Sequence, residues 1–153
     1  MIIGTKQLLE MVKNQNLVER LCDRELNNPE GEGFDLRVGE VFKLKGEIGG
    51  FLGITGRCTP KTELIAKYGK DKKVIFIPGD YGLVKTIEKV NLPDYVSAIC
   101  TPRTTLQRSG VILITSNTSP GYSGELTFGM FNAGPLPFKL ELGARITTII
   151  FNH

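Results

Sequence analysis

Short apolar runs, separated by clusters of Gly, Pro, Asn and Asp, follow one another along the chain from Phe34 onward. Runs of this length are typical of β-strands, and the residues between them are those that form turns. Such regular spacing favours a barrel or jelly roll over a parallel sheet with intervening helices. We expect strands over Phe34–Val38, Val41–Leu44, Lys73–Ile77, Tyr81–Ile87, Tyr95–Thr101, Val111–Thr115, Gly124–Asn132, Phe138–Leu140 and Ala144–Phe151.

Residues 4–21 differ from the rest, because their apolar side chains recur at a mostly helical spacing. The pattern predicts one amphipathic helix with Thr5 as its N-cap, interrupted near Asn14–Asn16. A second segment, Thr59–Lys72, fits either a short helix or an excursion between strands.

Length and composition fit one domain over residues 1–153. A chain of 153 residues buries about two thirds of its unfolded surface without metals or disulfides. Its 41% hydrophobic and 23% charged residues are close to the average for globular proteins, so a disordered or fibrous class is not indicated.

The charge pattern argues against a nucleic-acid partner. The formal net charge is +3 and the lysines are scattered, whereas nucleic-acid binding needs a concentrated basic patch. No apolar run approaches the roughly 18 residues of a membrane span, and the start lacks the layout of a signal peptide. Three cysteines without C-x-x-C spacing favour a reducing compartment. We therefore expect a cytoplasmic protein with no membrane partner.

The shortage of histidine excludes several mechanisms. His153 is the only histidine, so the sequence holds neither a His/Cys zinc cluster nor an imidazole base for a Ser or Cys nucleophile. No G-x-x-x-x-G-K-[ST] loop and no G-x-G-x-x-G turn occurs either. Phosphates, if bound, are held in another way.

One candidate for phosphate binding is "PRTTLQRSG", in which Arg103 and Arg108 flank Thr104 and Thr105. Guanidinium groups, hydroxyls and backbone amides can share the oxygens of a phosphate. The alternative is a pair of surface arginines at a turn.

Five segments follow one another in a fixed order over about 140 residues: "MIIGTKQLLEMV", "GEGFDLRVGEVFKL", "FIPGDYGLVKTIEKVNLPDYVSAI" leading into "RTTLQRSG", "SPGYSGELTF" and "NAGPLPFKLELGARITTIIF". Together they resemble the superfamily of trimeric dUTP diphosphatases and dCTP deaminases. The first looks like the N-terminal helix of the deaminase branch, and "RTTLQRSG" is similar to the signature R-S-S-L-x-R-x-G.

The resemblance implies a distorted β jelly roll with a short N-terminal helix, assembled as a homotrimer with active sites between subunits. It also implies a deoxynucleoside triphosphate, dUTP or dCTP, held with Mg²⁺. Phosphate-facing positions would be Arg103, Thr104, Thr105 and Arg108. The nucleoside pocket would lie in Thr115–Leu126, with Thr115, Ser119, Gly121, Tyr122 and Gly124 as binding residues. Asp35 matches a position that supports the metal site.

The acids that carry catalysis in this superfamily are replaced here. Ser119 stands where the diphosphatases have the Asp that orients water, and Gly129 where the deaminases have a Glu that shuttles protons. A serine is neutral at pH 7 and a poor general base. Thr148 replaces a Gln of the C-terminal motif.

Other carboxylates could compensate: Asp35, Asp80 or Glu125. The structural alternatives are a buried turn acid, a β-turn former and a solvated strand residue, respectively. Arg145, in "GARI", also has a counterpart in the superfamily, or it neutralises a neighbouring acid at the barrel rim.

The eleven residues from Arg108 to Ser119 resemble the shorter spacing of dUTPase-like members. Together with the missing deaminase Glu, this spacing favours hydrolysis of dUTP to dUMP and pyrophosphate. Two alternatives remain open: a dCTP deaminase-like enzyme, and a noncatalytic nucleotide-binding or structural trimer.

Overall fold

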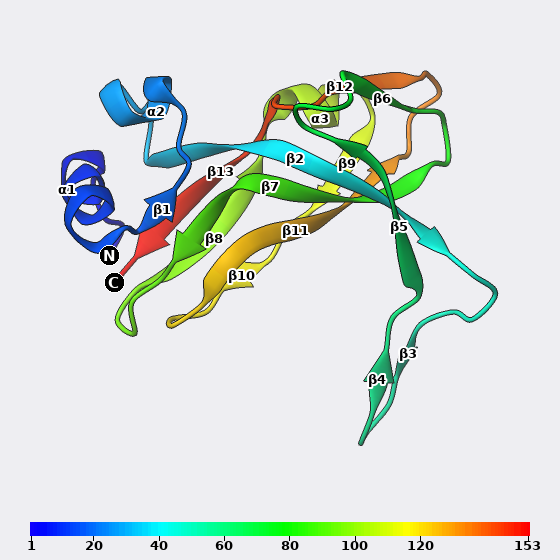
Figure 1. Ribbon diagram of the computed structural model, residues 1–153, viewed down its shortest axis with the longest axis horizontal. Helices are drawn as coiled ribbons and strands as arrows, with labels where there is room; N and C mark the ends of the chain where they lie inside the picture. The colour runs from blue at the N-terminus through cyan, green and yellow to red at the C-terminus, as the bar shows by residue number, and fades with distance from the viewer.

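A curled antiparallel sheet dominates the computed structural model, which describes residues 1–153 (Figure 1). Its strands follow the order β10 (Asn117–Thr118), β8 (Ser97–Pro102), β13 (Arg145–Asn152), β2 (Gly33–Lys45), β7 (Tyr81–Asn91), β11 (Ser123–Asn132) and β9 (Val111–Ile114). The short β1 (Val18–Glu19) pairs with β7, and β5 (Lys61–Lys67) pairs with β2. The architecture confirms the predicted mainly β, distorted jelly-roll fold.

Strand β2 joins two predicted strands into one of 13 residues. The predicted strands lay on either side of Gly39 and Glu40, yet here glycine is what lets the strand continue. A Cβ at Gly39 would lie 2.9 Å from Ile87 Cγ1, so only glycine permits this approach of β2 to β7. Register shifts beside Gly39 bend the strand, whose first half pairs with β13 and whose second half pairs with β5.

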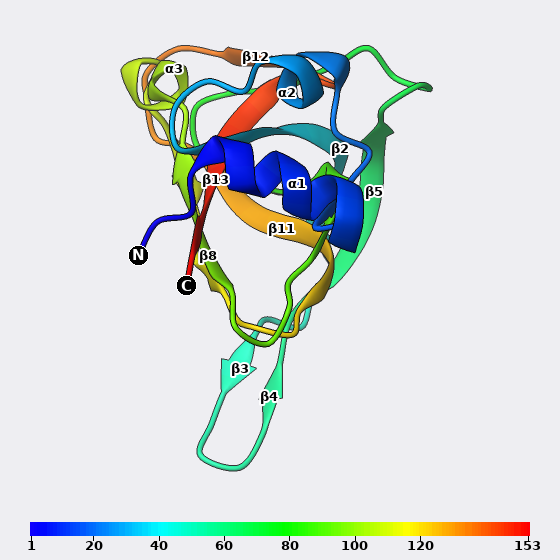
Figure 2. The same ribbon diagram turned by 90° about the vertical axis from the view of Figure 1, so that its left-hand side faces the viewer.

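The N-terminal helix is confirmed as α1 (Thr5–Gln15), and it ends where the sequence predicted an interruption. Its N-cap is Gly4 rather than Thr5, so the predicted cap was wrong by one residue. Asn16 adopts a left-handed φ of 55° and ends the helix. Figure 2 shows α1 crossing one end of the sheet, near both chain termini. A second helix, α2 (Asp23–Asn27), was not predicted.

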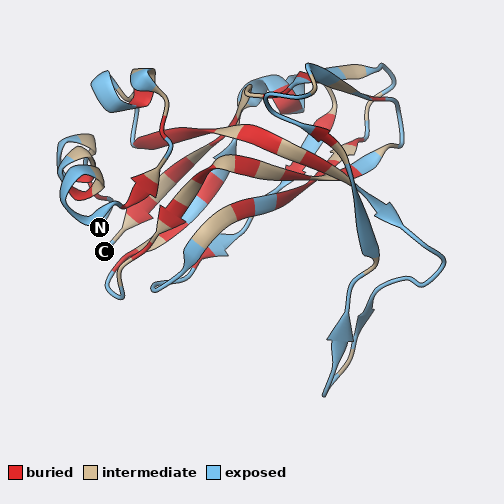
Figure 3. Ribbon diagram, viewed as in Figure 1, coloured by how far each residue is buried: buried red, intermediate tan, exposed pale blue.

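The core is one cluster of 29 buried apolar residues inside the curl, and Figure 3 shows how buried and less buried positions alternate along its strands. The rings of Phe34 and Phe151 meet edge to face with centroids 6.3 Å apart. Two acids are also fully buried, Glu25 and Glu88, and Oε1 of Glu88 accepts a hydrogen bond from Arg37 Nε at 2.6 Å. Burial raises the pKa of Glu88, against the opposing effect of Arg37.

A thin hairpin arm projects from the body beyond β2 and β5 (Figure 1). Its strands β3 (Phe51–Leu52) and β4 (Arg57–Cys58) pair only with each other. The side chains of Phe51 and Leu52 are 62% and 86% exposed. Behind the arm, the helix considered for Thr59–Lys72 is wrong, because this segment forms β5 along the second half of β2.

The remaining predicted strands form with shifted ends. Strands β6 (Lys73–Phe76) and β12 (Phe138–Glu141) make a separate two-stranded sheet, whereas the other predicted strands join the main sheet. None of the helices has the length and apolar character needed to cross a membrane.

Candidate functional site

The arginine segment singled out from the sequence contains a third helix, α3 (Thr104–Arg108). Arg103 is its N-cap residue in an extended conformation, and Leu106 anchors it in the core. The side chains of Thr104, Thr105 and Arg108 are exposed. Of the predicted phosphate-facing residues, three therefore stand open at the surface, and Arg103 alone pairs with an acid of this chain.

That acid is Asp35, the centre of a buried polar cluster. Its Oδ2 accepts hydrogen bonds from Nη1 of both Arg103 and Arg145, the latter at 2.9 Å. Its Oδ1 accepts the hydroxyl of Thr148 at 2.6 Å, and Arg24 Nη1 lies 3.9 Å from Oδ2. Asp35 is only 8% exposed, so these contacts compensate an otherwise costly buried charge. The neutralising role considered for Arg145 is thus present in the structure.

The surroundings of Asp35 do not fit a protein-bound magnesium ion. Its two oxygens already face a hydroxyl and cationic groups, and nowhere do three acidic, histidine or cysteine side chains cluster as ligands for a metal. Mg²⁺ is usually bound through one or two carboxylates together with substrate phosphates. This arrangement argues against a metal bound directly by Asp35, and an indirect role in supporting a metal stays a prediction.

A cationic cavity of about 320 Å³ opens beside α3. Arg103, Thr105, Lys139 and Arg145 contribute to its lining, together with one acid, Glu141. Guanidinium and ammonium groups around a hydroxyl are the donors that bind phosphate oxygens. Thr104 and Arg108, on the same helix, do not line this cavity.

The predicted nucleoside segment surrounds a second cavity of about 370 Å³, in which Glu125 is the only charged lining residue. Its polar lining includes Ser116, Asn117, Ser119, Tyr122, Glu125 and Thr127, without any lysine or arginine. The structure thus brings Ser119 and Tyr122 into one cavity, and their binding of a nucleoside stays a prediction. Thr115, Gly121 and Gly124 lie outside its lining. Gly121 forms the turn before β11 with a φ of 79°, and Gly124 lies within β11.

Among the compensating carboxylates proposed from the sequence, Glu125 alone lines this second cavity. Its Oε1 accepts a hydrogen bond from Arg20 Nη2 at 2.8 Å. A hydrogen bond to its own backbone, reinforced by the positive charge of Arg20, lowers the pKa of Glu125, so this carboxylate is charged at neutral pH. Asp80 instead accepts the backbone amide of Ile77 at 2.9 Å, as a turn-forming residue does.

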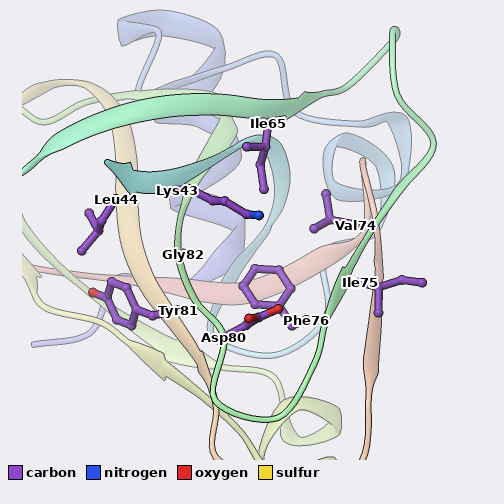
Figure 4. A pocket seen from close by; sticks show the side chains of 9 residues that line it. All are labelled: Lys43, Leu44, Ile65, Val74, Ile75, Phe76, Asp80, Tyr81 and Gly82. Carbon is purple, nitrogen blue, oxygen red and sulfur yellow. The ribbon is translucent and has the colours of Figure 1, made fainter. Parts of the chain in front are cut away.

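Gly129, the position of the absent deaminase acid, lies beneath a tyrosine. A Cβ at Gly129 would lie 2.3 Å from the hydroxyl oxygen of Tyr81 and 3.2 Å from Ile114 Cδ1. Tyr81 also lines a mostly apolar cavity of about 350 Å³, whose lining includes Lys43, Phe76 and Asp80 (Figure 4). No sequence motif pointed to Tyr81, because its contact with Gly129 depends on the pairing of β7 with β11.

Comparison with known families finds one family model that covers nearly the whole chain. The family model described as dCTP deaminase-like matches residues 2–153. The chain belongs to the dCTP deaminase-like family. This membership confirms the superfamily resemblance seen in the sequence motifs.

Named relatives of this dCTP deaminase-like chain include two dCTP deaminases. The one from Campylobacter curvus is 33% identical over 127 residues, which cover 78% of this chain and 62% of the relative. The one from Pyrococcus furiosus is 30% identical over 140 residues, which cover 92% of this chain and 77% of the relative. The chain thus matches less than two thirds of the length of the Campylobacter curvus protein.

A solved structure supports the fold alone. The 2′-deoxycytidine 5′-triphosphate deaminase from Agrobacterium tumefaciens superposes with a TM-score of 0.73 at 16% identity. The match covers 98% of this dCTP deaminase-like chain and 47% of the other.

Proposed function

We propose that this protein binds deoxycytidine triphosphate and acts as a dCTP deaminase-like protein. The observation that carries the proposal is the cavity formed by the predicted nucleoside segment, which contains Ser119, Tyr122 and the charged Glu125. The curated relatives named dCTP deaminase favour this alternative over dUTP hydrolysis, which the motif spacing had favoured. The nucleotide base would occupy this cavity.

The triphosphate would be held by the cations around α3. Arg103 and Arg145 are already fixed by Asp35, so their guanidinium groups are held in place before a ligand arrives. Prepositioned donors lower the entropy lost on binding. Exposed Thr104, Thr105 and Arg108 would supply further contacts at the open side of the helix.

A noncatalytic nucleotide-binding protein is the second candidate, and a specific observation favours it. Ser119 cannot act as a carboxylate base, and Tyr81 covers the position of Gly129. Both acids of the superfamily are therefore absent from a site that otherwise keeps its cavity.

Three measurements separate these functions. Ammonia release from dCTP would support the deaminase-like proposal, whereas pyrophosphate release from dUTP would support a hydrolase instead. A rise in melting temperature with dCTP but no product would support the noncatalytic binder, since a ligand that binds only the folded state stabilises it. If neither nucleotide changes the melting temperature and neither is converted, the proposed function is wrong.

We propose that Mg²⁺ enters with the triphosphate rather than through a site made by the protein alone. The comparison is dCTP binding with excess Mg²⁺ and with a chelator. Tighter binding with Mg²⁺, without any melting shift from Mg²⁺ alone, is the expected result. A melting shift from Mg²⁺ alone would contradict it.

We also propose that the chain assembles as a homotrimer. The exposed apolar side chains of the arm, Phe51, Leu52 and Ile54, are of the kind that protein interfaces bury. Light scattering should give about three times the 16.9 kDa of one chain, and a monomeric mass would contradict this assembly. A cytoplasmic location fits the three free cysteines and stays a proposal.

A further inference from the structure

Glu125 lies at the wall of the second cavity, where its position is fixed from several sides. Arg20 holds its Oε1 at 2.8 Å, and the hydroxyl of Tyr122 donates to its backbone oxygen at 2.7 Å. The ladder between β11 and β7 shifts register between Glu125 and Thr127. Such a bulge redirects a side chain away from the regular alternation of a strand.

The residues behind Glu125 form a continuous support. Arg20 Nε donates to the carbonyl of Ile87 at 2.8 Å, while its own carbonyl accepts Arg37 Nη2 at 2.7 Å. Arg37 in turn pairs with the fully buried Glu88. Arg20 has a left-handed φ of 64°, which is uncommon for a residue with a side chain. The surrounding contacts thus maintain a backbone geometry that directs Arg20 toward Glu125.

The second cavity offers a hydrogen-bond acceptor, the carboxylate of Glu125. An ionised carboxylate only accepts hydrogen bonds. Arg20, which pairs with Oε1 of Glu125, lines a neighbouring cavity together with Lys67 and Lys85, whereas no lysine or arginine lines the second cavity itself. The lining also holds the hydroxyls of Ser116, Ser119 and Thr127, each of which can donate or accept a hydrogen bond. A ligand group with N–H bonds is therefore favoured beside Glu125, and a carbonyl oxygen is disfavoured.

Cytosine and uracil differ in this respect. Cytosine carries an exocyclic amine, a donor, at the position where uracil carries a carbonyl oxygen, an acceptor. We infer that Glu125 accepts a hydrogen bond from the exocyclic amine of cytosine and thereby makes the cavity select dCTP over dUTP. This inference rests on the proposed function, because it names the residue that sets base specificity at the same site.

The test compares the affinities of dCTP and dUTP in the full chain and in Glu125→Gln, by titration calorimetry with the recovered nucleotides checked by chromatography. A glutamine amide can donate to uracil or accept from cytosine, so the variant no longer distinguishes the two. The dCTP:dUTP affinity ratio should fall by about 10-fold or more, as expected for loss of a hydrogen bond to a charged group. If dCTP is converted, the ratio of kcat/KM values serves as the same readout.

Glu63→Gln provides the matched control, because Glu63 is an exposed glutamate on β5, away from the cavity. It should leave the ratio unchanged, and the melting temperature of each unliganded variant reports on folding. An unchanged ratio in Glu125→Gln would overturn the inference. An equal loss of affinity for both nucleotides would also overturn it, because it would indicate a contact with a part that the two nucleotides share, such as the sugar. Failure of the unchanged chain to bind either nucleotide would overturn the proposed function itself.

Discussion

Thr148 and Asp35 face each other across β13 and β2, and the threonine hydroxyl donates to Asp35 Oδ1 at 2.6 Å. The sequence motif has a glutamine at the position of Thr148, and the shorter side chain here directs its hydroxyl to the neighbouring strand. Because Arg103 and Arg145 share the other oxygen, one carboxylate links three segments that are distant in the sequence. Asp35 is thus a positioning residue for the cationic cavity.

Replacing Asp35 by asparagine should lower the free energy of unfolding by about 3 kcal/mol, because two arginines lose the partly buried charge that compensates them. Urea denaturation at pH 7 measures the change. Asp94→Asn, at an exposed aspartate, is the control and should shift stability by less than about 0.5 kcal/mol. Equal stability of the two variants would show that the Asp35 cluster is not stabilising.

Gly33 and Gly129 should respond very differently to alanine. A Cβ at Gly33 would lie 1.8 Å from the backbone oxygen of Ile149, which cannot move without disrupting β13. We expect a loss of at least about 3 kcal/mol there. At Gly129 the obstacle is the end of the Tyr81 side chain, which can rotate away, so the loss should be about 1 kcal/mol. Thermal unfolding of both variants tests this order, and the reverse order would contradict it.

Arg108→Ala should weaken dCTP binding by about 10-fold or more without unfolding the protein, because Arg108 is exposed and its proposed contact is a charge-assisted one. Titration calorimetry gives the affinity, and circular dichroism checks the fold. Arg57→Ala, in the exposed arm, is the control for loss of a positive charge. Unchanged affinity in Arg108→Ala would remove this residue from the phosphate site.

The cysteines should differ in reactivity. Burial raises the pKa of Cys100 from 9.0 to about 12, whereas Cys58 is exposed in the arm. Thiol reagents attack the thiolate, so at pH 8 Cys58 should be alkylated within minutes and Cys100 only after unfolding. Mass spectrometry of digested samples locates the label. Rapid labelling of Cys100 in the folded protein would contradict its burial.

The same shift has a consequence for stability at high pH. The thiol of the unfolded chain loses its proton near pH 9, while that of the folded chain keeps it up to about pH 12. The contribution of Cys100 to stability is therefore complete below pH 9 and is lost as the pH rises toward 12. Cys100→Ala should abolish this part of the pH dependence in urea denaturation between pH 8 and pH 10.

The sequence predicted the elements whose pattern is local. Short apolar runs between clusters of turn-forming residues identified the strands that build the core, and the helical spacing before Asn16 identified α1. The segment β5 was missed as a strand because its exposed, polar face gives no clear alternation. Helix α3 was missed because five residues between Arg103 and Ser109 are too few to show a helical period.

The candidate site was predicted only in part, because its geometry depends on distant pairings. Motifs placed Ser119 and Tyr122 in one hairpin, and the structure places both at one cavity. The contact of Asp35 with Arg103 spans 68 positions, and that with Arg145 spans 110. Such contacts follow from the order of strands in the sheet, which no local pattern specifies.

The arm formed by β3 and β4 connects β2 to β5, and these two strands are also paired directly with each other. Its strands pair only with each other, while the flanking β2 and β5 are joined by their own ladder. A protease cut near Arg57 would therefore leave both fragments attached through the body of the protein. The arm is a natural place to divide the chain into two separately expressed pieces that reassemble.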